Sequence, residues 1–265
     1  MPRFFVPSVQ EDSVRITGAD GLHLTKALRV RPGEKLTLCD GNGTDALCEV
    51  ASASAGEVDL RVLRRYPNET EPRLRLHLYQ CFPKGDKFEL ILQKAVELGA
   101  ARIIPVFSER CVSRPDRKAQ DNRLSRFRRI AAEAAGQSER GVIPEVGGFV
   151  SFREAVEGCP KPGVLFYEKG GVPLRSLEGE LLRLAGRASG PLPDGTTPAG
   201  EAPSSGAAGG AFSIFIGPEG GLAEEEAALA EANGIRPASL GPRILRTETA
   251  GLAAAAALLL MSGDL

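Results

Sequence analysis

Histidine is scarce in this chain of 265 residues, which contains only His23 and His77. Its five cysteines are widely spaced and form no Cys-x-x-Cys pair: Cys39, Cys48, Cys81, Cys111 and Cys159. These residues supply no credible set of zinc ligands. We therefore expect no metal site, and we expect free, mostly buried thiols of the kind found in a reducing cytosol.

Long hydrophobic runs and an excess of one charge are also absent. The longest apolar run, residues 250–261, is too short to span a bilayer and is typical of a buried helix. The N-terminal MPRFFVPSVQ lacks the apolar stretch of a signal peptide. The net charge is −1, so the overall composition indicates no nucleic-acid partner. We expect a cytoplasmic protein without a membrane partner, with 42% hydrophobic residues to form its core.

The first 72 residues predict a small β-barrel or compact sheet. Short stretches of alternating polarity are separated by turn dipeptides, and Asn42-Gly43 between two such stretches indicates a hairpin. Residues 66–72, rich in proline and polar side chains, are typical of a linker. We therefore place a domain boundary between residues 72 and 73.

Residues 73–265 alternate strand and helix patterns and predict an α/β domain with an open parallel sheet. The segment from residue 86 carries apolar residues on one helical face, and Gly99 would end that helix. A second helix is expected over residues 121–136, and Ser151 with Glu154 forms the capping box of a third. Residues 186–211, rich in Gly, Pro, Ser and Ala, predict a flexible surface insertion.

The glycine-rich turn IGPEGG, residues 216–221, follows an apolar strand and precedes a helix, where open α/β sheets bind ligands. The chain lacks both the G-K-[ST] of a P-loop and a G-x-G-x-x-G motif. Glu219 would also repel a phosphate unless a cation lay between them. The turn therefore favours a ligand with hydroxyl and amine groups over a phosphate.

A second polar turn, LGPRILRTETAG, spans residues 240–251 and again precedes an apolar helix. Thr247 or Thr249 could cap that helix, and Glu248 could favour its dipole. Capping does not explain the two arginines in the turn, Arg243 and Arg246. We interpret the two turns as parts of one pocket at the ends of neighbouring strands.

Taken together, these motifs closely resemble the bacterial 16S ribosomal RNA uridine-N3 methyltransferases of the SPOUT superfamily. The resemblance rests on IGPEGG, LGPRILRTETAG, PKGDKFELILQKAVELGA and AAGQSERGVIPEV, and on MPRFF and HLTKALRVRPGE in the N-terminal part. It covers nearly the whole chain except residues 186–211. It implies a PUA-like N-terminal barrel, a trefoil knot in the C-terminal domain and a homodimer. The implied reaction is methylation of N3 of uridine 1498 in 16S ribosomal RNA of the small subunit.

The resemblance also implies S-adenosylmethionine as the cofactor and assigns residues to it. The implied cofactor-binding residues are Leu165, Tyr167, Glu168, Ile216, Gly217, Pro218, Glu219, Gly220, Leu240, Gly241, Arg243, Ile244, Leu245 and Thr247. Such a reaction needs a cation beside the negative charge that gathers on the base, and a proton acceptor. We assign Arg246 and Glu248 to these roles; the alternative, that they pair with each other or cap the helix, stays open.

RNA contacts are expected from clusters of basic side chains. Residues 102–140 hold many arginines against only five acidic residues, more positive charge than solubility requires. The candidate RNA-binding residues are Arg3, Lys26, Arg29, Arg31, Arg128, Gln137, Ser138 and Arg140. Three other functions remain as alternatives: a methyltransferase for another RNA position, a non-catalytic RNA-binding protein, and a nucleotide-binding enzyme.

Overall fold

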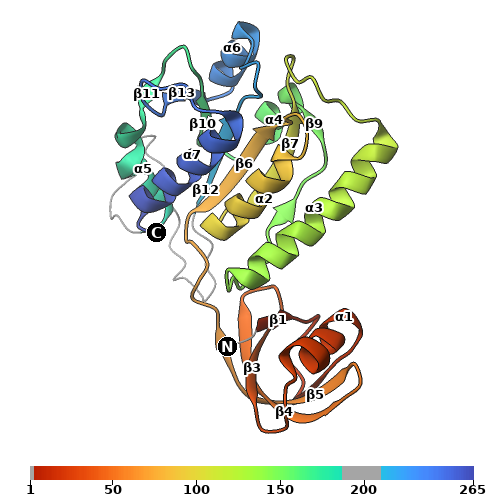
Figure 1. Ribbon diagram of the computed structural model, residues 1–265. Coiled ribbons are helices and arrows are strands. Elements are labelled where there is room, and N and C mark those ends of the chain that lie inside the picture. Colours follow the sequence, from red (N-terminus) through yellow and green to blue (C-terminus); the bar gives the residue numbers. More distant parts are fainter. Residues whose placement is uncertain (1–2, 187–209) are drawn as a thin grey trace. The chain divides into compact units, whose positions relative to one another are not determined.

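A computed structural model describes residues 3–186 and 210–265, so most of the insertion expected at 186–211 lies outside the described residues. The chain divides into two compact units (Figure 1). The β unit comprises Met1–Glu71 together with Ala135–Ile143, and the α/β unit comprises Pro72–Ala134 and Pro144–Leu265. Within the described residues, no helix is long and apolar enough to cross a membrane.

The β unit is a five-stranded sheet in the order β1-β3-β4-β5-β2, with a short helical segment after β2. All its strand pairs are antiparallel except β1 with β3. The hairpin expected at Asn42-Gly43 is confirmed, because it joins β3 to β4. The elements are β1 (Arg3–Phe5), β2 (Ser13–Ile16), α1 (Gly18–Leu22), η1 (His23–Leu28), β3 (Lys35–Cys39), β4 (Thr44–Ser54) and β5 (Glu57–Pro67).

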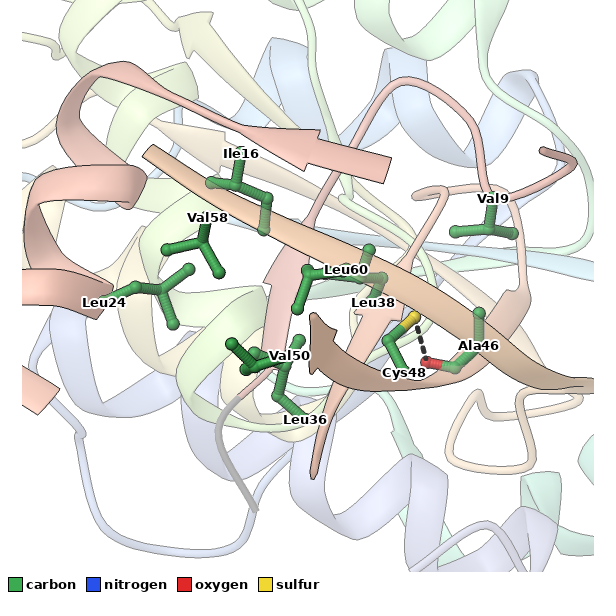
Figure 2. Packing of buried hydrophobic residues seen from close by; sticks show 10 residues of the cluster. All are labelled: Val9, Ile16, Leu24, Leu36, Leu38, Ala46, Cys48, Val50, Val58 and Leu60. Atoms are coloured by element: carbon green, nitrogen blue, oxygen red, sulfur yellow. Dashed lines mark hydrogen bonds between the residues drawn. The ribbon is translucent and has the colours of Figure 1, made fainter. Parts of the chain in front are cut away.

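Alternating side chains of these strands form the core of the β unit (Figure 2). Because successive residues of a strand point to opposite faces, every second residue of β3, β4 and β5 turns inward. The buried cluster consists of Val9, Ile16, Leu24, Leu36, Leu38, Ala46, Cys48, Val50, Val58 and Leu60. Leu24 reaches it from the one-turn π-helix η1, after which Arg29 takes a left-handed conformation with φ 54°.

The segment expected to be a linker, residues 66–72, is tied into the β unit. Strand β5 continues to Pro67, so Tyr66 is part of a strand and that part of the linker prediction is wrong. The carboxylate of Glu71 accepts hydrogen bonds from the guanidinium of Arg140 and from the backbone N–H groups of Gly141 and Val142. These contacts join residues about 70 positions apart in the chain, which a local sequence pattern cannot reveal.

The α/β unit has an eight-stranded sheet, all of whose pairs are parallel, which confirms the predicted fold class. The order is β11-β13-β10-β12-β6-β7-β8, and β9 also pairs with β7. The strands are β6 (Arg75–Cys81), β7 (Arg102–Phe107), β8 (Glu145–Val146), β9 (Val150–Ser151), β10 (Gly163–Phe166), β11 (Val172–Pro173), β12 (Ala211–Ile216) and β13 (Ile235–Ser239).

Helices connect and cover these strands. Helices α2 and α7 lie side by side, and α7 packs on β6 and β12 (Figure 1). The helical elements are α2 (Lys87–Leu98), α3 (Arg117–Gln137), α4 (Phe152–Gly158), η2 (Leu174–Leu177), α5 (Glu178–Leu184), α6 (Glu224–Ala232) and α7 (Thr247–Ser262).

Capping residues set the boundaries of helices α2, α3 and α4. Helix α2 ends as expected at Gly99, whose φ of 106° suits glycine. The capping box of Ser151 and Glu154 is confirmed at the start of α4. Helix α3 begins four residues earlier than expected, because the carboxylate of Asp116 accepts the N–H of Ala119 and so caps it.

Candidate active site at the carboxyl ends of β10, β12 and β13

The three segments with candidate site residues leave the same edge of one sheet. Strands β10, β12 and β13 are parallel, and β10 lies between the other two. The two polar turns therefore follow strands that flank β10, so the prediction that these two strands are neighbours is wrong. Residues 165–168 at the end of β10 come between them. Carboxyl ends of parallel strands are the usual place for a ligand in such sheets.

A buried chain of hydrogen bonds fixes two of these segments to strand β6. The hydroxyl of Thr247, at the start of α7, donates to the carbonyl of Gly217 in the glycine-rich turn at 2.7 Å. That hydroxyl accepts from the side-chain amide of Gln80 at 2.9 Å. Both Gln80 and Thr247 are buried, at 0% and 5% exposure. Thr247 therefore positions the turn against α7 and does not cap the helix with its side chain.

Gln80 was not among the sequence candidates. Its signal was present in the strand RLRLHLYQC, where it follows Leu78 and Tyr79 near the carboxyl end of the strand. A polar side chain buried at a strand's carboxyl end needs hydrogen-bond partners. The amide of Gln80 donates to the carbonyl of Cys81 and to the hydroxyl of Thr247, which lies 167 positions away in the chain.

Lys87, on the first turn of α2, pairs with both glutamates of the polar turns. Its Nζ lies 3.0 Å from Oε1 of Glu219 and 3.2 Å from Oε2 of Glu248. The backbone N–H of Lys84 also donates to Glu219 Oε1 at 3.3 Å. The cation that the sequence argument required beside Glu219 is thus present in the protein. The charge of Glu219 therefore does not exclude a phosphate ligand. The absence of a P-loop and of a G-x-G-x-x-G motif still argues against one.

The ion pairs keep both glutamates ionised. Partial burial opposes ionisation of Glu219, but hydrogen bonds from its own N–H and from Lys87 outweigh it and lower its pKa. The pKa of Glu248 is lowered by a hydrogen bond from its own N–H, against some burial, and by Lys87. The pKa of Lys87 is raised by the hydrogen bonds to Glu219 and Glu248. At neutral pH, two carboxylates and one ammonium meet at this edge of the sheet.

Replacing Lys87 by methionine is expected to lower the free energy of unfolding slightly at pH 7, because partly exposed ion pairs contribute modestly. Glutamates with a lowered folded-state pKa stabilise the fold above their unfolded pKa, and that stabilisation is lost as pH falls through the folded value. The difference from the unmodified protein should therefore be smaller at pH 3 than at pH 7 in urea unfolding.

Lys94→Met is the matched control, since Lys94 lies on the same helix and pairs with Glu97 of that helix at 2.8 Å, away from the two polar turns. Its loss should cost less than Lys87→Met at pH 7. Equal costs for the two variants, or a Lys87 effect that is undiminished at pH 3, would contradict the assignment of Lys87 to the two glutamates.

Arg246 stands at the N-terminal boundary of α7. Its backbone is extended, with φ −66° and ψ 152°, and its carbonyl accepts the N–H groups of Thr249 and Ala250 at 2.8 Å. The side chain is exposed, and within the described residues its guanidinium makes no hydrogen bond or ion pair. The alternative in which Arg246 pairs with Glu248 is therefore not the arrangement in this structure, where Glu248 pairs with Lys87.

The end of β10 adds two features to this edge. The hydroxyl of Tyr167 is buried and has no hydrogen-bond partner within the part of the chain that the structure describes. At Gly221, where φ is 69°, a β-carbon would lie 2.5 Å from Oε1 of Glu168, so the turn and Glu168 approach closely only because residue 221 is glycine. Arg110 supports the same turn by donating to the carbonyl of Gly220 at 3.1 Å.

The remaining cofactor candidates differ in exposure. Leu165 and Ile216 are buried ends of β10 and β12, and Pro218 is buried in the turn. In the segment after β13, Gly241, Arg243 and Ile244 are exposed, and Leu240 and Leu245 are half-buried. The side chain of Ile244 is 88% exposed, unusual for so large an apolar residue.

The candidate RNA-binding residues of the β unit fall into two groups. Lys26, on η1, and the following Arg29 and Arg31 are exposed. Arg3 is buried in an ion pair with Asp45, and Arg140 is buried in an ion pair with Glu71 at 2.6 Å, so both guanidiniums hold the β unit together. Gln137 is exposed and Ser138 half-buried. In the α/β unit, Arg128 is exposed on α3.

Metal ligands do not gather at this edge or elsewhere in the described segments. Across residues 3–186 and 210–265, no group of three or more His, Cys, Asp or Glu side chains is placed to hold a metal ion. All five cysteines are free and buried.

Each of the two units matches a known protein family. Residues 70–259 match the RNA methyltransferase domain family, and residues 16–63 match the RNA methyltransferase PUA domain. The ribosomal RNA small subunit methyltransferase E of Bacillus subtilis is 33% identical to this chain, with 97% of this chain and 96% of that protein aligned. The protein of the same name from Mycobacterium bovis is 32% identical, with 90% of this chain and 83% of that protein aligned.

Solved structures agree with these matches. A ribosomal RNA small subunit methyltransferase E from Neisseria gonorrhoeae, bound to S-adenosyl methionine, has a TM-score of 0.78 and 31% identity. The alignment covers 97% of this chain and 96% of that chain. A Legionella pneumophila protein in complex with the bound cofactor SAM has a TM-score of 0.77 and 27% identity over 97% of this chain and 96% of its own.

Proposed function

Because this chain belongs to the RNA methyltransferase family and carries the PUA domain of RNA methyltransferases, we propose that it methylates 16S ribosomal RNA of the small subunit. The methyl donor is S-adenosylmethionine, and the methylated atom is N3 of a single uridine, uridine 1498. One observation of the structure carries this proposal furthest: the ends of β10, β12 and β13 and the exposed Arg246 meet at one sheet edge.

The residues at this edge fit S-adenosylmethionine. The unpartnered hydroxyl of Tyr167 offers a donor and an acceptor to a ligand with hydroxyl and amine groups. Three glycines in the turn at 217–221 leave it with few side chains, so that a ligand can approach its backbone closely. When bound, the cofactor supplies an electrophilic methyl group on a sulfonium centre. We assign it to Leu165, Tyr167, Glu168, Ile216, Gly217, Pro218, Glu219, Gly220, Leu240, Gly241, Arg243, Ile244, Leu245 and Thr247.

Arg246 and Glu248 carry the chemistry in this proposal. The reaction forms a bond between uridine N3 and the methyl carbon, breaks the bond from that carbon to sulfur, and releases the N3 proton. Arg246, exposed and unpaired within the described residues, stabilises the negative charge on the base. Glu248 is ionised and can accept the proton, and its pairing with Lys87 makes it a weak base. Holding the two reacting atoms in line supplies much of the remaining acceleration.

The target uridine must be unpaired or turned out of its helix, since N3 is hidden in a base pair. The exposed cations Lys26, Arg29, Arg31 and Arg128 are proposed to contact RNA phosphates. Gln137, which is exposed, and Ser138 belong to the GQSER segment and are proposed to lie near the RNA. Arg3 and Arg140 support RNA binding by holding the β unit together, given their buried ion pairs.

A homodimer is part of the same proposal. No charged residue occurs in α7 between Glu248 and the following Asp264, and the outward face of the helix is apolar. On that face Leu252, Ala253, Ala256 and Ala257 are half-buried and Leu260 is 64% exposed. A helix that is apolar on all sides is normally buried, and a second copy of the chain would bury this one.

Replacing Leu260 by glutamate should therefore convert a dimer into a 28.0 kDa monomer, because it places a charge in an apolar interface. Light scattering coupled to size exclusion measures the mass. Leu90→Glu is the control: Leu90 lies on α2, is 47% exposed, and should leave the dimer intact. A monomeric unmodified protein, or a dimeric Leu260→Glu variant, would contradict the use of this face.

The domain boundary is placed between residues 72 and 73, and the C-terminal domain is proposed to contain a trefoil knot. The return of α7 onto β6 and β12, the first and the second-last strands of the unit in chain order, supports the knot. The enzyme works in the cytoplasm, where small ribosomal subunits are, without a metal.

Calorimetric titration with S-adenosylmethionine tests the cofactor part of the proposal and separates it from the RNA-binding alternative. We expect saturable binding of one molecule per chain. Absence of binding, together with retained affinity for ribosomal RNA, would point instead to a non-catalytic RNA-binding protein. The same titration of Thr247→Val tests whether the hydrogen bonds of Thr247 help to form the cofactor site.

A further inference from the structure

The β unit has a cavity of about 450 Å³ beside the end of β5. Its walls include Arg3 of β1, Asp45 of β4, Arg64 and Tyr66 of β5, and Asn68 and Thr70 of the following segment. This volume lies within the range of roughly 300–1,000 Å³ that is usual for small-molecule pockets. None of the candidate active-site residues lines the cavity, so it requires a separate explanation.

One wall of the cavity holds a buried cation with an unused donor. The side chains of Arg3 and Asp45 form an ion pair and are 7% and 5% exposed. The amide of Asn68 donates to the other carboxylate oxygen of Asp45 at 2.9 Å. Within the described residues, Nε of Arg3 has no hydrogen-bond partner. Because buried donors are nearly always paired, this one is available to an acceptor that the described residues do not supply.

A cationic aromatic platform forms another part of the wall. The guanidinium carbon of Arg64 lies 4.9 Å from the centre of the Tyr66 ring. Aromatic rings and guanidinium planes are the surfaces on which unpaired bases stack, and the positive charge of Arg64 suits a phosphate attached to such a base. The carbonyl and hydroxyl groups of Asn68 and Thr70, which hydrogen-bond each other at 2.8 Å, supply a polar edge beside the platform.

We infer that this cavity binds one unstacked nucleotide of the RNA substrate. The inference rests on the proposed function, which requires unpaired RNA near the target uridine. The base stacks on Tyr66 and Arg64, and an oxygen of the nucleotide accepts from Arg3. A free nucleotide has the same chemistry. The RNA is favoured because the cavity lies in the unit that matches the RNA methyltransferase PUA domain.

Binding of a labelled 16S ribosomal RNA fragment to the full chain, without methyl donor, tests the inference. Tyr66→Ala should weaken binding about tenfold or more, as expected for the loss of one stacked base. Tyr66→Phe keeps the ring and should stay within twofold of the unmodified protein. Equal affinities of Tyr66→Ala, Tyr66→Phe and the unmodified protein would overturn the inference.

A second pair of variants keeps the test open if Tyr66→Ala does not fold. Arg64→Ala removes the charge over the ring, whereas Arg61→Ala removes a charge on the same strand that pairs with Glu49 outside the cavity. Arg64→Ala should weaken RNA binding several times more than Arg61→Ala. Equal effects of the two arginine variants would show only a general charge contribution and would overturn the inference.

Binding of uridine monophosphate and methyl transfer, measured on the same variants, distinguish a failure of the cavity inference from a failure of the proposed function. Tyr66-dependent binding of uridine monophosphate, with RNA affinity unchanged by Tyr66→Ala, would assign the cavity to a free nucleotide and overturn the assignment to RNA. Tyr66-dependent RNA binding by a chain that transfers no methyl group would support the cavity and reject the proposed methyl transfer. Normal methyl transfer with Tyr66-independent RNA binding would reject the cavity alone.

Discussion

Arg246→Ala is expected to reduce methyl transfer to 16S ribosomal RNA by at least about a hundredfold, while the affinity for S-adenosylmethionine stays within a few-fold. The loss is the usual size for one charge-stabilising donor removed from a reacting centre. The expectation follows from the position of Arg246, which is exposed at the start of α7 and unpaired within the described residues. A guanidinium in an internal ion pair would not be free to act on the base.

Single-turnover transfer and calorimetric cofactor titration together measure this effect. Arg246→Lys keeps the charge but loses the planar donor fork, so it should recover only part of the activity. Arg153→Ala, on α4, removes a positive charge that pairs with Glu157 and should change transfer less than twofold. A fully active Arg246→Ala variant would remove Arg246 from the mechanism.

Thr247→Val is expected to reduce the affinity for S-adenosylmethionine by about tenfold and to lower the free energy of unfolding by about 1–3 kcal/mol. The substitution keeps the shape of the side chain but removes the hydroxyl between Gln80 and Gly217. The carbonyl of Gly217 then loses its donor in a half-buried position, and the buried amide of Gln80 loses an acceptor, which together carry this cost. The glycine-rich turn is no longer fixed against α7, so cofactor contacts weaken.

Thr249→Val provides the matched control, because Thr249 lies two residues further along the same helix and is exposed. Thr249→Val should leave both the affinity for S-adenosylmethionine and the free energy of unfolding nearly unchanged. Cofactor titration and urea unfolding of both variants are the measurements. If the two variants behaved alike, the hydrogen bonds of Thr247 would have no particular part in forming the cofactor site.

Local features of the fold were predictable because they depend on neighbouring residues. The end of α2 at Gly99, the capping box of Ser151 and Glu154, and the hairpin at Asn42-Gly43 each follow from short-range backbone geometry. The fold class followed from the alternation of strand and helix patterns. The order of the strands did not, since which parallel strands become neighbours depends on packing across the whole unit.

The site was predictable as a set of loops, but its internal contacts were not. Both polar turns were found from glycine, proline and charged residues after apolar strands. The pairing of Lys87 with Glu219 and Glu248 joins segments more than 130 positions apart, and no spacing rule connects them. The burial of Arg3 and Arg140 was missed for the same reason, because their partners Asp45 and Glu71 are distant in sequence.

Transfer of a labelled methyl group from S-adenosylmethionine to small ribosomal subunits lacking their native uridine-N3 methylation tests the central claim most directly. Reverse transcription then maps the product, because a methyl group on N3 blocks the pairing edge of the base. The account predicts labelled 16S ribosomal RNA with one new stop, at uridine 1498. Transfer with a stop elsewhere would contradict the assigned target, and no transfer from bound S-adenosylmethionine would contradict the assigned reaction.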